Sequence, residues 1–148
     1  MAESGKRKQV ILLVDDNPDE ALLIRRAFER ASQRLRIESL ASGSEALAYL
    51  KGETPYTDRS KHPLPDLVLL DTKMRAVNGF DVLRWIRRQP ALAALCVIML
   101  TATDQIRDVN LAYRLGATSS LAKPQHYRDA AELSRSVDSF LSRQKTLR

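Results

Sequence analysis

Several features that mark particular protein classes are scarce in this sequence. Its single cysteine, Cys96, permits no internal disulfide, and His62 and His126 have no cysteine or histidine cluster around them, so a structural zinc site is not expected. The longest apolar run, Ala91 to Leu100, is too short to cross a membrane, which takes about 20 residues. The segment Val10 to Val14 is too short for a signal-peptide core. We therefore expect a cytoplasmic protein with no membrane partner.

Glycine is also scarce, with five residues in a chain of 148. A dinucleotide-binding domain needs a glycine-rich turn after its first strand, and the segment VDDNPDE (Val14–Glu20) contains no glycine. What the chain does contain is a hydrophobic fraction of 44% and a charged fraction of 28%. These values, at this length, indicate one globular domain with a substantial core.

The formal charge of +6 raises the question of nucleic-acid binding. Residues 1–8 carry a net charge of +2 and residues 143–148 carry +3, which leaves +1 for everything between them. We interpret these segments as an N-terminal and a C-terminal basic tail around one domain at residues 9–142. Because the excess charge lies on the two ends and not on one folded face, sequence-specific nucleic-acid binding is not expected.

Strand and helix patterns alternate five times along the chain. The expected strands are Gln9–Val14, Leu35–Leu40, Leu67–Leu70, Cys96–Leu100 and Ser119–Ala122, and the expected helices follow them at about 18–31, 43–50, 80–89, 104–115 and 127–141. Such alternation predicts a parallel sheet with helices on both faces. Residues 51–65 are polar and contain three prolines, which indicates a long surface loop rather than a domain boundary.

Polar residues follow four of the predicted strands at their carboxyl ends. They are Asp15, Asp16, Asp71, Thr101 and Lys123. In a parallel sheet these ends share one edge, so the side chains should converge in one crevice. Three neighbouring carboxylates repel one another unless cations lie among them. Lys123 supplies one positive charge, and a hard divalent ion, preferably Mg²⁺, would supply the rest. Alone, each residue could be a helix cap, a strand end or a solvated charge. Together they suit an incoming phosphoryl group with a carboxylate as nucleophile.

With its motifs at these spacings, the chain resembles the receiver domain of bacterial two-component response regulators. The motifs are LLVDDN (Leu12–Asn17), LVLLD (Leu67–Asp71), NGF (Asn78–Phe80), IMLTAT (Ile98–Thr103) and LAKP (Leu121–Pro124). The resemblance covers about Gln9 to Leu141. It implies an α/β, flavodoxin-like, doubly wound sheet of five parallel strands in the order 2-1-3-4-5, with helices on both faces.

The resemblance also implies roles for the polar cluster. Asp71 would accept a phosphoryl group from a histidine kinase. Asp16, Asp71 and the backbone carbonyl of Lys73 would hold Mg²⁺, with Asp15 assisting through water. The residues implied to bind the phosphoryl oxygens are Thr101 and Lys123. A protein of this kind is a phosphoprotein of a two-component system and not an enzyme, although it assists its own phosphotransfer and dephosphorylation.

The long loop at residues 51–65 and the absence of an output domain resemble the stand-alone receivers that partner phytochrome-type histidine kinases. Output would then run through protein contacts or a phosphorelay. We also expect a homodimer through the fourth helix, fifth strand and fifth helix. On the fourth helix, the apolar spacing predicts that Ile106, Val109 and Tyr113 face the core and that Leu111 points outward, as a partner contact.

Two residues depart from the family pattern. Arg75 stands four residues after Asp71, where the family usually has proline, and Ser120 stands three before Lys123, where it usually has an aromatic switch residue. A pseudo-receiver that docks partners without being phosphorylated therefore stays open as the alternative. A haloacid-dehalogenase-type phosphatase is excluded, because it needs a second aspartate two positions after the first and this chain has Lys73 there.

Overall fold

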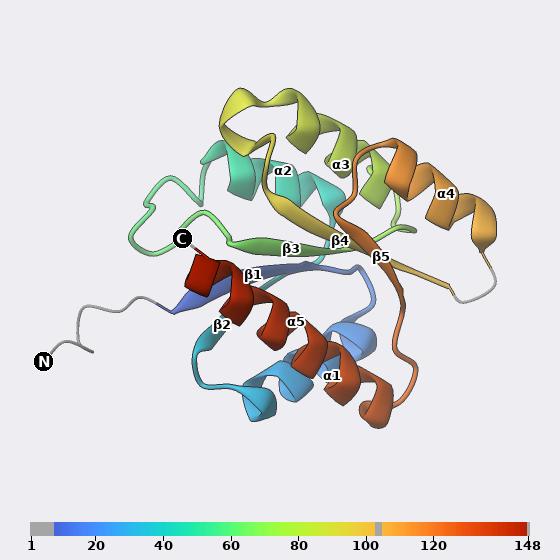
Figure 1. Ribbon diagram of the computed structural model, residues 1–148. Helices are drawn as coiled ribbons and strands as arrows, with labels where there is room; N and C mark the ends of the chain where they lie inside the picture. Colours follow the sequence, from blue (N-terminus) through green and yellow to red (C-terminus); the bar gives the residue numbers. More distant parts are fainter. Residues whose placement is uncertain (1–7, 103–104, 148) are drawn as a thin grey trace, which may run out of the picture.

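A five-stranded parallel sheet forms the middle layer of the protein, as seen in the computed structural model, which describes residues 8–102 and 105–147 (Figure 1). Its strands are β1 (Gln9–Val14), β2 (Leu35–Leu40), β3 (Leu67–Asp71), β4 (Cys96–Thr101) and β5 (Ser119–Ala122). Their order is β2-β1-β3-β4-β5, and every neighbouring pair is parallel. The predicted fold class and strand order are confirmed.

Helices cover both faces of this sheet. They are α1 (Pro18–Ala31), α2 (Gly43–Lys51), α3 (Gly79–Arg88), α4 (Ile106–Arg114) and α5 (Tyr127–Leu147). Figure 1 shows α1 and α5 together on one face, with α2, α3 and α4 on the other. No helix in the described part of the chain is long and apolar enough to span a membrane.

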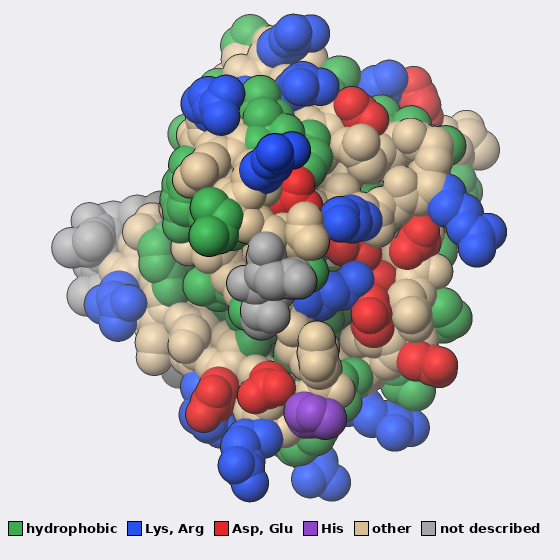
Figure 2. All heavy atoms as spheres, turned by 90° about the vertical axis from the view of Figure 1, so that its right-hand side faces the viewer, with side chains coloured by type: hydrophobic (Ala, Val, Ile, Leu, Met, Phe, Trp, Pro, Cys, Tyr) green, Lys and Arg blue, Asp and Glu red, His purple; other side chains and the backbone are tan. Residues whose placement is uncertain are grey.

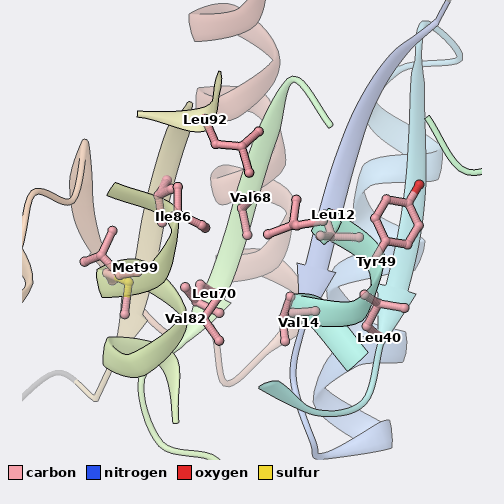
Figure 3. Close-up of a cluster of buried hydrophobic side chains, with 14 of the residues drawn as sticks. Leu12, Val14, Leu40, Tyr49, Val68, Leu70, Val82, Ile86, Leu92 and Met99 are labelled. Carbon is pink, nitrogen blue, oxygen red and sulfur yellow. The ribbon is translucent and has the colours of Figure 1, made fainter. Parts of the chain in front are cut away.

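Alternate residues of β1 enter two different cores. Ile11 and Leu13 are fully buried in the core beneath α1 and α5, whereas Leu12 and Val14 are fully buried in the core beneath α2 and α3 (Figure 3). Burying one such side chain contributes about 1.5–3 kcal/mol. Because helices cover both faces of the sheet, the sequences of the central strands are continuous apolar runs. The carboxyl ends of these parallel strands lie together at one edge of the sheet.

Side-chain caps mark the starts of α1 and α3. Asn17 accepts hydrogen bonds from the amides of Asp19 and Glu20, at 2.9 and 3.2 Å. Asn78 and Asp81 form a reciprocal capping box at the start of α3. These caps satisfy amides that the first helical turn leaves without partners, and they fix the loops that follow β1 and β3.

The predicted loop at residues 51–65 is tied to α2 by hydrogen bonds. The Arg59 guanidinium donates to the carbonyls of Tyr49 and Leu50, at 2.8 and 2.9 Å, which are carbonyls of the last helical turn. The Tyr49 hydroxyl donates to the carbonyl of Pro63 at 2.8 Å. Side-chain hydrogen bonds therefore close this loop back onto the helix that precedes it.

The predicted facing of α4 is wrong. Ile106 and Tyr113 are 72% and 50% exposed, whereas Ala112 is fully buried and Leu111 packs against the core beneath α2 and α3. Residues 106, 109 and 113 have helical spacing, but so do residues 108, 111, 112 and 115. Spacing alone cannot choose between these two stripes, and the choice depends on how the helix lies against the sheet.

Three smaller points concern element ends and burial. The helix α5 continues past the expected end at Leu141 to Leu147, so residues 143–147 are helical and not a separate tail. Cys96 is partly buried, and burial raises the pKa of its thiol. The start expected for the fourth helix at residue 104, and nearly all of the N-terminal tail, lie outside the described residues.

One glycine allows α3 to begin directly against the end of β3. A Cβ atom at Gly79 would lie 2.1 Å from the carbonyl oxygen of Asp71, closer than real Cβ contacts allow. The Gly79 amide also donates to the carbonyl of Thr72 at 3.1 Å. The NGF motif therefore fixes the backbone around Asp71.

We predict that Gly79→Ala lowers the free energy of unfolding by about 1–3 kcal/mol or more, because backbone atoms must move to admit the methyl group. Urea denaturation of the two proteins measures this difference. Ala76→Gly in the same loop is the control, because Ala76 has a φ of 60°, which glycine adopts without strain, and it should cause no loss. Equal urea midpoints for Gly79→Ala and wild type would contradict the prediction.

Candidate functional site

The carboxyl ends of the strands bring all the predicted site residues to one edge of the sheet. Asp15 and Asp16 follow β1, Asp71 ends β3, Thr101 ends β4, and Lys123 follows β5. Figure 2 looks onto this side of the molecule and shows acidic side chains among Lys and Arg side chains. The parallel arrangement of the strands, rather than proximity in the sequence, produces this convergence.

Three carboxylates form a tight cluster at this edge. Asp15, Asp16 and Asp71 each offer an oxygen, and these oxygens all lie within 4.8 Å of one another. Asp15 and Asp71 are each only 2% exposed, whereas Asp16 is partly exposed. One backbone amide donates to each of them. The donors to Asp15, Asp71 and Asp16 are the amides of Asn17, Lys73 and Arg75, at 2.9, 3.2 and 3.2 Å.

Lys123 is the cation of the cluster. Its Nζ lies 2.8 Å from Asp71 Oδ2, 2.6 Å from Glu20 Oε1 and 4.0 Å from Asp15 Oδ1. Glu20, in the first turn of α1, is a member of the site that the sequence did not reveal, because its partner Lys123 lies far away in the sequence. One lysine thus faces four acidic groups, if the partly exposed Asp16 is included.

The pKa values of the cluster show that its charges are poorly balanced. Burial raises the pKa of Asp15 to about 7, against the opposing hydrogen bond from the Asn17 amide. Burial also raises the pKa of Asp71, although Lys123 opposes that shift. For Lys123, burial alone would lower the pKa, but its contacts with Asp71 and Glu20 outweigh burial and raise it. Two buried aspartates therefore resist ionisation.

The cluster fits a hard cation. Asp15 Oδ2 is buried and has no hydrogen-bond partner among the described residues, which is an unfavourable state for a carboxylate oxygen. The three aspartates supply only oxygen ligands, the kind that Mg²⁺ prefers. An ion among these oxygens would favour their ionised forms and partner the orphaned atom.

Thr101 and Lys73 lie at the same edge of the sheet. The Thr101 side chain is 3% exposed, and its hydroxyl lies 3.5 Å from the Leu121 carbonyl, at the outer limit of a hydrogen bond. The Thr101 hydroxyl is thus only weakly engaged. The Lys73 backbone amide contacts Asp71, and its side chain is exposed.

An aromatic side chain reaches the position of Ser120 from another element. The Ser120 amide donates to the Tyr113 hydroxyl of α4 at 3.1 Å, while the Ser120 hydroxyl oxygen is buried without a partner in the described part of the chain. Tyr113 lies in α4 and Ser120 lies seven residues later, in β5. Neither helical nor strand periodicity predicts a contact between them.

Comparisons with known proteins agree with this geometry. Residues 11–135 match the family model described as the response regulator receiver domain. The probable methanogenesis regulatory protein FilR2 of Methanothrix harundinacea is 40% identical over 120 residues, which cover 81% of this chain and 75% of FilR2. The response regulator Rcp1 of Synechocystis sp. is 27% identical over 140 residues, which cover 95% of this chain and 93% of Rcp1.

Solved structures share the whole architecture. The crystal structure of the phosphorylated cyanobacterial phytochrome response regulator RcpA matches 90% of this chain and 94% of its own, with a TM-score of 0.82 and 26% identity. The crystal structure of the Mn²⁺-bound form of Rcp1 also matches 90% of this chain and 94% of its own, with a TM-score of 0.78 and 28% identity. Because the family model spans all three aspartates, Thr101 and Lys123, and because the fold and its polar edge agree with it, this chain belongs to the family of response regulator receiver domains.

Proposed function

We propose that this protein is a single-domain response regulator of a two-component system that accepts a phosphoryl group from a histidine kinase on Asp71. One observation carries this proposal. Asp71 is buried at the end of β3, within 4.8 Å of two other carboxylates and 2.8 Å from the Lys123 ammonium. A carboxylate so placed is a nucleophile beside groups that can neutralise an incoming phosphoryl group.

In the proposed reaction, an oxygen of Asp71 attacks the phosphorus of a phosphohistidine. The phosphorus–nitrogen bond breaks, the imidazole leaves with the bonding pair, and an aspartyl phosphate forms. The Lys73 amide and Lys123 hold the two Asp71 oxygens before attack. Lys123 and the weakly engaged Thr101 hydroxyl would then bind the phosphoryl oxygens, which supports the roles expected for them.

Mg²⁺ would be held by Asp16, Asp71 and the backbone carbonyl of Lys73, with Asp15 assisting through water. When bound, the ion neutralises charge on the phosphoryl oxygens. The residues themselves support this assignment through the 4.8 Å carboxylate cluster and the orphaned Asp15 oxygen. The protein has no proposed enzymatic role beyond assisting phosphorylation and dephosphorylation of its own Asp71.

The proposed phosphodonor is a phytochrome-type histidine kinase. This finer assignment is supported by the likeness to RcpA, which is a phytochrome response regulator, and by the long loop at residues 51–65 that Arg59 closes onto α2. We propose that the protein acts in the cytoplasm and signals through protein contacts or a phosphorelay, without sequence-specific binding to nucleic acid.

Incubation with acetyl phosphate and Mg²⁺ should add the mass of one phosphoryl group to the wild-type protein. Asp71→Asn should remain unlabelled, because the nucleophilic oxygen is lost, and Asp58→Asn in the exposed loop is the matched control that should label normally. Intact-mass spectrometry makes the measurement. A pseudo-receiver would show no mass increase in the wild type, and labelling of Asp71→Asn would refute Asp71 as acceptor.

We predict that, without Mg²⁺, Asp15 makes the protein less stable as the pH rises from 3.8 towards about 7. The pKa of Asp15 in the folded state lies above its ordinary value of 3.8, so the folded state holds a proton that the unfolded chain has lost, and stability falls through this window. Thermal melting of wild type and Asp15→Asn measures the effect, and Mg²⁺ should reduce the wild-type slope. Identical slopes in the two proteins would contradict it.

We also propose a homodimer through α4, β5 and α5, because two large apolar side chains of α4, Ile106 and Tyr113, are 72% and 50% exposed. Sedimentation velocity should detect a dimer that Ile106→Glu converts to monomer, while Leu22→Glu, at a side chain of α1 that is 45% exposed, should not. Ser120 is too small to act as a rotamer switch, so a phosphodonor should change the dimer little. A monomer that dimerises only after phosphorylation would show this view to be wrong.

A further inference from the structure

The backbone amide of Arg75 donates to Asp16 Oδ2 at 3.2 Å. Among the described residues this is the only hydrogen bond that the Asp16 side chain accepts from the protein. The family usually has proline at position 75, and proline has no backbone N–H. The hydrogen bond therefore exists because this chain departs from the family pattern.

The loop that carries Arg75 has a fixed course. Ala76, the next residue, has a φ of 60°, a conformation that non-glycine residues adopt only when the surroundings hold them there. Two residues further on, Asn78 caps α3, and Gly79 packs against the Asp71 carbonyl. The Arg75 amide thus points at Asp16 from a backbone anchored to the same strand end that carries Asp71.

The Arg75 side chain belongs to the same surroundings. Arg75 and Asp16 line one open pocket of about 550 Å³. The Arg75 guanidinium is exposed and has no hydrogen-bond or ion-pair partner in the part of the chain that the structure describes. A free positive charge in the pocket that Asp16 lines opposes the approach of a second cation.

We propose that Arg75 is a positioning residue for Asp16 in Mg²⁺ binding, with its amide and its side chain acting in opposite directions. The amide bonds Oδ2 and so restricts rotation of the Asp16 carboxylate before the ion binds, so that less freedom is lost on binding. The guanidinium weakens binding through repulsion. This inference rests on the Mg²⁺ site of the proposed function, and not on phosphorylation of Asp71.

Isothermal titration with Mg²⁺ on wild type, Arg75→Ala and Arg75→Pro separates the two effects. The two variants lack the guanidinium alike and differ in the amide N–H. Arg75→Ala should bind Mg²⁺ more tightly than wild type at low salt, with the gain lost at high salt. Arg75→Pro should bind about tenfold more weakly than Arg75→Ala, at the low end for a supporting hydrogen bond because this one is partly exposed.

A second measurement does not depend on how well the proline variant folds. Amide hydrogen exchange, followed by NMR without Mg²⁺, should be faster at Arg75 in Asp16→Ala than in wild type. The Lys73 amide, which donates to Asp71, is the internal control and should keep its rate.

Equal Mg²⁺ affinity in Arg75→Ala and Arg75→Pro would overturn the inference. An Arg75 amide that exchanges at the same rate in Asp16→Ala and in wild type would also overturn it. Failure of the proposed function is detected elsewhere. A wild-type protein that binds Mg²⁺ and discriminates between these variants, yet takes no phosphoryl group, would refute phosphorylation and leave the positioning role of Arg75 standing.

Discussion

The ion pair between Lys123 and Asp71 is the interaction on which the polar edge of the sheet depends. It joins the ends of β3 and β5 at 2.8 Å, across the intervening strand β4. Without it, two buried aspartates and Glu20 would face one another with no cation among them. Even with it, burial keeps the pKa of Asp15 near 7. A further cation among these carboxylates would therefore stabilise the site. A negatively charged phosphoryl group would also stabilise it, by sharing the Lys123 ammonium with Asp71.

The rest of the fold serves to hold these charges where their repulsion cannot be relieved by movement. Alternate residues of β1 enter both cores, so this strand cannot slide without exposing apolar side chains on both faces. Gly79 lets α3 start against the Asp71 carbonyl, and Asn17 fixes the turn after Asp15 and Asp16. Burial energy spread over the whole sheet therefore stabilises an edge that is locally unfavourable.

The two departures from the family pattern have structural counterparts. At Arg75 the chain gains a backbone donor to Asp16, and at Ser120 it loses an aromatic side chain but gains a contact from Tyr113 to the strand backbone. The first acts on the cluster itself. The second joins α4 to β5 on the face proposed for dimerisation. A shift of α4 would therefore move the backbone of β5 through this hydrogen bond, without any aromatic ring changing its rotamer.

The sequence by itself determined the strands and the identity of the clustered aspartates, because local periodicity depends on nearby residues and these aspartates directly follow or end two of the strands. Only the tertiary structure decided which stripe of α4 faces the core, that Glu20 pairs with Lys123, and that the Arg75 amide meets Asp16. Two stripes with equal helical spacing are indistinguishable until a sheet lies beneath one of them. Contacts between residues far apart in the chain are likewise set by how β1, β3 and β5 align at one edge, which no local pattern encodes.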